Sequence, residues 1–107
     1  GRRLFFTGDT TAGLGAALAA ARPDLLVVEV TYPSRMEEMA RRYTHMTPSL
    51  LATELMALRR EGRVLPRILA VHMHPTYEAE IWRELMDITD RTGCRIDMAR
   101  EGMALTV

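Results

Sequence analysis

Three ionisable residues end or follow strand-like segments at widely separated points of the chain. Asp9 comes after the first apolar segment, Glu29 lies near the end of the second, and His72 follows the third. In open α/β sheets, ligands bind beyond the carboxyl ends of the strands, so these side chains are expected to converge. An aspartate oxygen and a neutral histidine nitrogen suit Zn²⁺ or Mn²⁺. The pattern therefore predicts a metal site to which Asp9 and His72 contribute.

Each of the three residues also has a purely structural explanation. Asp9 is followed by two threonines and an Ala-rich stretch, so it can act as the cap of a helix. Glu29 can be a solvated residue at a strand end, and an isolated histidine such as His72 is commonly a core residue with satisfied hydrogen bonds. Finding all three at corresponding strand ends favours a shared site over three separate structural roles.

Strand-like and helix-like segments alternate along the chain, which indicates an α/β domain built on one sheet. Continuous apolar runs are typical of strands that are covered on both faces, and leucines three and four residues apart mark the buried side of a helix. Helix signals include a capping box at Ser34 and Glu37, an N-cap at Thr47 and a terminator at Gly62. We predict strands over 3–7, 25–30, 67–71, 94–98 and 104–107, and helices over 12–21, 34–43, 48–62 and 77–93.

The composition excludes several classes of protein. The 107 residues suffice for a single domain with a modest core, and a formal net charge of zero provides no global field for nucleic acid. The chain has no lysine, which excludes Schiff-base chemistry. Cys94 is the only cysteine, so an internal disulfide is excluded and a reducing, cytoplasmic setting is expected. No apolar run approaches the length of a membrane span.

Four segments resemble motifs of metallo-β-lactamase-fold hydrolases. Segment 4–10, Leu-Phe-Phe-Thr-Gly-Asp-Thr, resembles the strand and Gly-Asp-Thr motif of that superfamily. Segment 26–32, Leu-Val-Val-Glu-Val-Thr-Tyr, is similar to the His-Glu-Ala-Thr motif of ribonuclease Z, with valine in place of the histidine. Segment 43–47, Tyr-Thr-His-Met-Thr, is similar to the His-Ser-Thr region that follows it, and segment 68–72 resembles the last metal-ligand strand. Class II cyclic-nucleotide phosphodiesterases share the last two likenesses.

The resemblance implies a role for each candidate residue. Asp9 would bridge two metal ions and His72 would bind one of them. Glu29 and His45 would form a dyad in which the carboxylate orients an imidazole that protonates the leaving oxygen, a task suited to a side chain that exchanges protons near neutral pH. His74 would contact substrate or exchange roles with His72. Read alone, His45 is equally well explained as a solvent-facing loop residue.

The same resemblance implies that residues 1–107 are a C-terminal half-domain. The upstream His-x-His-x-Asp-His motif of the superfamily is absent from the sequence. The fold would then be the second half of an αββα sandwich, with one mixed sheet and its helices packed on the outer face. The inner face of the sheet would be exposed and apolar, so we expect a partner, either the missing N-terminal half or a second copy that dimerises or swaps elements.

The function expected from these inferences is metal-dependent hydrolysis of a phosphodiester, in RNA or a cyclic nucleotide, by a metal-activated water. Two donors fall short of the three protein ligands usual for catalytic zinc, so the isolated chain should bind metal weakly and be inactive. Two alternatives stay open: a thioester or lactam hydrolase on the same scaffold, and a non-catalytic scaffold half that serves only assembly.

Overall fold

The structure is a computed structural model that describes residues 3–6 and 22–99. Its strands and helices alternate along the chain, as the sequence predicts. Two short 3-10 turns, η1 and η2, precede the helices α2 and α4. The elements are β1 (Leu4–Phe6), β2 (Leu25–Glu29), η1 (Ser34–Met36), α2 (Glu37–Arg42), α3 (Pro48–Arg60), β3 (Arg67–Val71), η2 (Pro75–Tyr77), α4 (Glu78–Thr92) and β4 (Ile96–Met98).

The four described strands form one parallel sheet in the order β1-β2-β3-β4. Leu26 pairs with Ile68, and Ile68 in turn pairs with Ile96. The predicted α/β class and single sheet are confirmed. The sheet was predicted to be mixed, whereas every described pairing is parallel. The predicted strand over 104–107 and helix over 12–21 lie outside the described residues.

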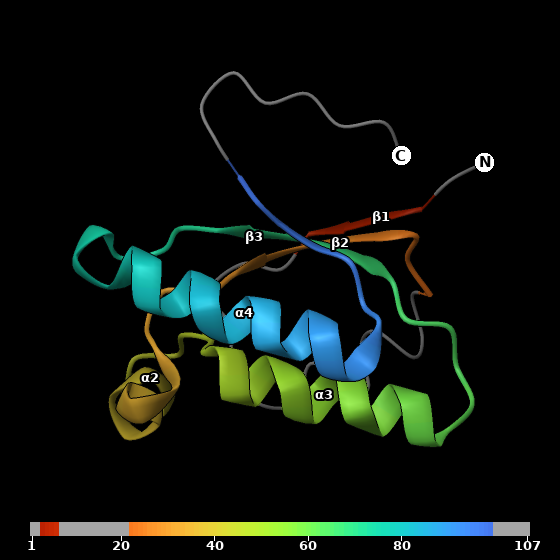
Figure 1. The fold of residues 1–107 in the computed structure, drawn as a ribbon, viewed down its shortest axis with the longest axis horizontal. Helices are drawn as coiled ribbons and strands as arrows, with labels where there is room; N and C mark the ends of the chain where they lie inside the picture. Colours follow the sequence, from red (N-terminus) through yellow and green to blue (C-terminus); the bar gives the residue numbers. More distant parts are fainter. Residues whose placement is uncertain (1–2, 7–21, 100–107) are drawn as a thin grey trace.

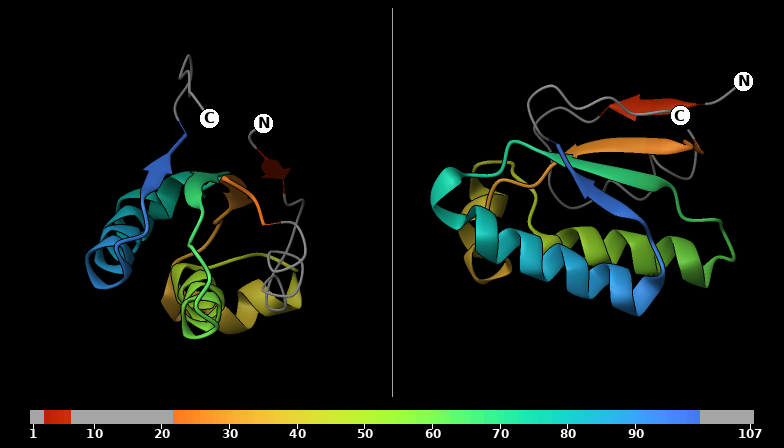
Figure 2. Two further views of the ribbon diagram at one scale, coloured as in Figure 1. Left: turned by 90° about the vertical axis from the view of Figure 1, so that its right-hand side faces the viewer. Right: turned by 45° about the horizontal axis from the view of Figure 1, so that its top comes forward.

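The described helices cover one face of the sheet (Figures 1 and 2). In Figure 1, α3 and α4 run side by side beneath the strands. Leu26 and Val28 of β2 and Ile68 of β3 point to this side and are fully buried against the apolar faces of the two helices. The helical spacing seen in the sequence marks that face correctly, and its buried members are Leu51, Leu55, Leu58, Ile81, Leu85 and Ile88.

The opposite face of the sheet carries the alternate residues of each strand. Leu4, Leu25 and Arg67 share one row on it, and Val27 pairs with Leu69 in the next. Leu4 is 54% exposed, whereas Leu25 and Val27 are only 4% exposed. The predicted exposure of this face is therefore wrong at β2. No helix within the described ranges is long and apolar enough to cross a membrane.

The helix starts follow the sequence signals in one case and depart from them in another. The Thr47 hydroxyl accepts a hydrogen bond from the Leu50 amide at 3.2 Å, which confirms the N-cap of α3. The capping box predicted at Ser34 and Glu37 is wrong. The Ser34 hydroxyl instead accepts from the Ser49 amide at 2.9 Å, because α3 begins beside it in space.

Candidate active site

The carboxylate of Glu29 meets the imidazole of His45 at the carboxyl edge of the sheet. Glu29 is 4% exposed, and its Oε2 lies 3.5 Å from Nδ1 of His45. Its Oε1 accepts a hydrogen bond from the Met46 amide at 2.8 Å, and the Thr31 hydroxyl donates to Oε2. Nδ1 of His45 is buried, while 25% of the His45 side chain is exposed. The ring is therefore partly open to solvent, with its Nδ1 side toward a carboxylate.

His45 is positioned by the way in which α2 ends. The His45 amide donates to the Ala40 carbonyl at 2.8 Å, and the Thr44 amide donates to the Arg41 carbonyl at 3.3 Å. This pair of hydrogen bonds is a Schellman motif, in which the residue after the cap adopts the left-handed conformation. Thr44 has φ 60°, a conformation that is costly for a β-branched side chain. The strain is located directly before the imidazole, where such strain commonly marks a functional site.

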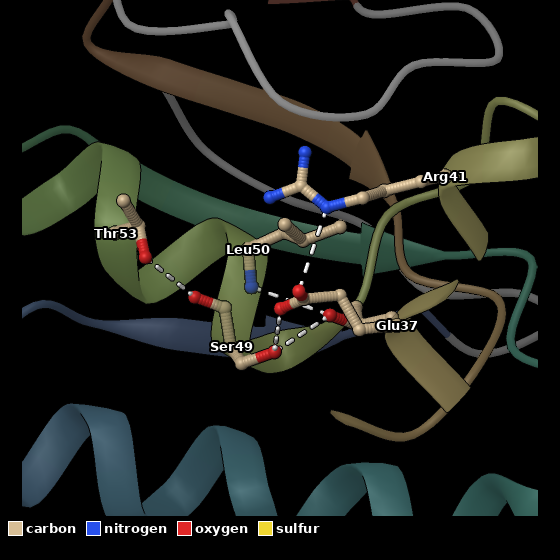
Figure 3. Close-up of polar contacts among 6 residues, drawn as sticks. Glu37, Arg41, Ser49, Leu50 and Thr53 are labelled. Atoms are coloured by element: carbon tan, nitrogen blue, oxygen red, sulfur yellow. Dashed lines mark hydrogen bonds and ion pairs between the residues drawn. The ribbon is translucent and has the colours of Figure 1, made fainter. Parts of the chain in front are cut away.

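A set of polar contacts between α2 and α3 holds the two ends of the loop over 43–47 that carries His45. Figure 3 shows Glu37 reaching toward both Arg41 and Ser49. Arg41 Nε lies 3.4 Å from Glu37, and the Ser49 hydroxyl donates to Glu37 at 3.3 Å. Ser49 also lies 3.0 Å from the hydroxyl of Thr47. The start of the loop is thus fixed by the hydrogen bonds at the end of α2, and its last residue, Thr47, is fixed by the contacts of Ser49.

Aromatic rings gather beside the dyad. Tyr32 meets His45 edge to face with ring centroids 5.6 Å apart, and it stacks near His74 at 6.1 Å with an interplanar angle of 24°. Tyr77 lies 5.2 Å from His74 and 6.4 Å from Tyr32. The guanidinium of Arg35 sits 5.3 Å from the centre of the Tyr77 ring. We call Tyr32, His74 and Tyr77 the ring cluster.

His72 and His74 follow β3 but differ in their surroundings. Both are exposed, and His72 has φ 60° directly after the last strand residue. The His74 amide donates to the Thr31 carbonyl at 3.0 Å, which ties the segment after β3 to the segment after β2. Nδ1 of His74 accepts from the Thr76 amide at 3.2 Å. A neutral His74 therefore carries its proton on Nε2, and Nε2 is then a hydrogen-bond donor rather than a metal ligand.

The expected metal site is not assembled by the described residues. No three histidine, cysteine, aspartate or glutamate side chains in ranges 3–6 and 22–99 group closely enough to hold a metal. Asp9, the predicted oxygen donor, lies outside the described residues, so its relation to His72 stays a prediction. In the described part of the chain, Glu29 contacts His45, and Tyr32 contacts both His45 and His74. His72 lies two residues before His74 in the sequence.

Sequence reasoning missed the ring cluster and Arg35. Tyr32 is half-buried, and its ring contacts those of His45 and His74. Arg35 forms two contacts with Glu80, at 2.9 and 3.2 Å, and this carboxylate raises the pKa of Arg35. The sequence did hold one signal for the ring cluster: Tyr32 and Tyr77 each come shortly after a predicted strand. These two strands, β2 and β3, are neighbours in the sheet.

Fold and site together define an α/β domain with a carboxylate–imidazole pair at the carboxyl edge of a parallel sheet. Two proteins called ribonuclease Z, from Bradyrhizobium diazoefficiens and Brevibacillus brevis, are similar to this chain. Each is 35% identical over 80 residues, or 75% of the chain. The aligned part spans about a quarter of their length, 25% and 24% respectively. No family model and no solved structure matches. The similarity supports the metallo-β-lactamase resemblance over that part of the chain.

Proposed function

We propose that this chain supplies the proton-donating part of a metal-dependent phosphodiesterase that cleaves RNA in the manner of ribonuclease Z. The single observation that carries the proposal is the contact between buried Glu29 and partly exposed His45. The similarity to two ribonucleases Z favours RNA over a cyclic nucleotide as substrate.

In this proposal His45 is the general acid. Its protonated imidazole donates a proton to the leaving oxygen as the phosphorus–oxygen bond breaks, so the product leaves as an alcohol. Glu29 stabilises the imidazolium by charge attraction, which burial strengthens by excluding water. The Met46 amide and Thr31 hydroxyl keep the carboxylate facing the ring. His45 then takes a proton from solvent, which restores the starting state.

The metal is a further part of the proposal, and it rests on the resemblance. Asp9 and His72 would contribute ligands to Zn²⁺ or Mn²⁺, with the other ligands supplied by an N-terminal half-domain or a second copy. Such a metal supplies an activated water for attack on phosphorus. We place the activity in the cytoplasm.

Zinc titration of the isolated chain by calorimetry tests the ligand assignment. Two donors should bind zinc weakly, and both Asp9→Ala and His72→Ala should weaken this binding further. His74→Ala should leave it unchanged, because Nδ1 of His74 is occupied by the Thr76 amide and Nε2 would then be a donor. Tight stoichiometric binding by the unaltered chain would contradict the two-donor assignment.

A chimaera tests the proton-donor role. The matching segment of Brevibacillus brevis ribonuclease Z is replaced by the segment from this chain, and cleavage of an RNA precursor is measured. His45→Asn should lower kcat on the order of 10²- to 10⁴-fold, the usual contribution of general acid catalysis. Glu29→Gln should also lower kcat, while Glu38→Gln, the same change at an exposed position of α2, should not.

The leaving group separates proton donation from a structural effect. A p-nitrophenyl phosphodiester has a leaving group that departs without a proton, so His45→Asn should slow its hydrolysis far less than that of RNA. Equal losses on both substrates would show that His45 does not act as an acid.

A further inference from the structure

We infer that the ring cluster of Tyr32, His74 and Tyr77 is a stacking platform that binds a nucleobase next to the phosphodiester. The inference deepens the proposed function and rests on it for the position of the scissile bond. It assigns a substrate-binding role to His74 and Tyr77, which take no part in the proton transfer proposed for Glu29 and His45.

The cluster adjoins the dyad through direct ring contacts. Centroid separations of 5.6 Å from His45 to Tyr32 and 6.1 Å from Tyr32 to His74 leave no gap between acid and platform. His74 is exposed, and Tyr32 and Tyr77 are half-buried. A base that flanks a phosphodiester held at His45 would therefore meet aromatic surface first. Stacking on aromatic side chains is the common way in which proteins hold unpaired bases.

The ring of His74 is fixed before any ligand arrives. Its backbone is tied to Thr31, and its Nδ1 caps the turn at Thr76. Because these contacts set the ring orientation, little conformational freedom remains to be lost on binding. The Nε2 proton of the neutral ring gives the platform a hydrogen-bond donor, which suits the acceptor oxygens and nitrogens of a nucleotide.

A cation lies near the ring of Tyr77. Arg35 lies 5.3 Å from the Tyr77 ring centre, and the two contacts of Arg35 with Glu80 fix the guanidinium there. A cation over a ring face is attractive and aligns the ring. Since Glu80 balances the charge of Arg35, this pair is better suited to orienting Tyr77 than to binding phosphate by itself.

NMR titration of the 107-residue chain with mononucleotides, in buffer with a chelator, tests the platform without metal or turnover. AMP should shift the ring resonances of His74 and Tyr77, and ribose 5-phosphate, which lacks only the base, should leave them in place. His74→Asn keeps an acceptor for the Thr76 amide but removes the ring, so it should weaken AMP binding on the order of tenfold or more. Tyr43→Leu removes an exposed tyrosine outside the cluster and should bind AMP normally.

Two outcomes would overturn the inference: ring shifts of equal size with ribose 5-phosphate, or unchanged AMP affinity in His74→Asn. Absence of any AMP-dependent shift at millimolar concentration would overturn it as well. Parallel titrations with cyclic AMP and with a short single-stranded RNA identify which nucleotide the platform prefers. Failure here would leave the kinetic effects of His45→Asn intact, whereas failure of the proposed function would appear in those kinetics and not in AMP binding.

Discussion

The buried carboxylate of Glu29 binds two consecutive residues of the same loop. One oxygen lies 3.5 Å from the His45 imidazole and the other accepts from the Met46 amide at 2.8 Å. The end of β2 is thereby joined to the loop between α2 and α3. A single side chain thus serves both the stability of the loop and the orientation of the candidate acid.

Glu29→Ala should destabilise the protein because it leaves the buried Met46 amide without an acceptor. Loss of one partner of a buried hydrogen bond costs about 1–3 kcal/mol. Glu29→Gln should cost less, since its amide oxygen can still accept from Met46. Urea unfolding monitored by circular dichroism measures both. Equal stability of the alanine variant and the unaltered chain would mean that the Glu29 contacts contribute nothing net.

Thr44→Gly should stabilise the protein, although it removes a side chain. A left-handed conformation costs an L-residue about 1–2 kcal/mol, and glycine escapes this at an entropic cost of about 0.5–1 kcal/mol. The expected gain in the free energy of unfolding is therefore between about 0 and about 1.5 kcal/mol. The same change at exposed Thr53, inside α3, should lower stability by about 0.3–0.5 kcal/mol, the difference between glycine and threonine in helix propensity. Changes of the same sign at both positions would argue against relief of strain at Thr44.

The described strands were largely predictable because each is a short apolar run that a parallel sheet buries. The strand over 67–71 was predicted with its observed bounds, and α3 and α4 were predicted within two residues at each end. In each case the signal lies in neighbouring residues. The N-cap at Thr47 was predictable for the same reason, because the Leu50 amide that it caps is only three residues away in the sequence.

Contacts between distant segments were not predictable in this way. The Ser34 hydroxyl was expected to cap its own helix, but the start of α3 supplies a competing amide from Ser49. Thr44 gave no sign of a left-handed helix end, because glycine is the usual residue there. The pairing of Glu29 with His45 was expected only from the resemblance to ribonuclease Z. The ring cluster forms only because β2 and β3 are neighbours in the sheet, and the sequence pattern does not specify that pairing.

When the His74 ring is neutral, its proton should lie on Nε2. The Thr76 amide donates to Nδ1 at 3.2 Å, so that nitrogen cannot itself carry a proton while the bond persists. Long-range ¹H–¹⁵N correlation spectra distinguish the two tautomers directly. His74→Phe, which has no acceptor, should lose about 1 kcal/mol of stability, while His74→Asn should retain most of it. Observation of the Nδ1 proton would restore His74 as a candidate metal ligand.

Cys94 should make the protein less stable at high pH. The thiol is 3% exposed and donates to the Pro66 carbonyl at 3.2 Å, and burial raises the pKa of Cys94 from 9.0 to about 11. Between these values the unfolded chain has lost the thiol proton and the folded chain has kept it. The stability that this thiol contributes is therefore complete below pH 9.0, falls by up to about 1.4 kcal/mol per pH unit between the two pKa values, and levels off above pH 11.

Unfolding free energies of Cys94→Ala, subtracted from those of the unaltered chain, isolate this dependence on pH because all other titrating groups are shared. A difference that stays constant from pH 8 to about 11 would show that the Cys94 thiol ionises equally readily in both states.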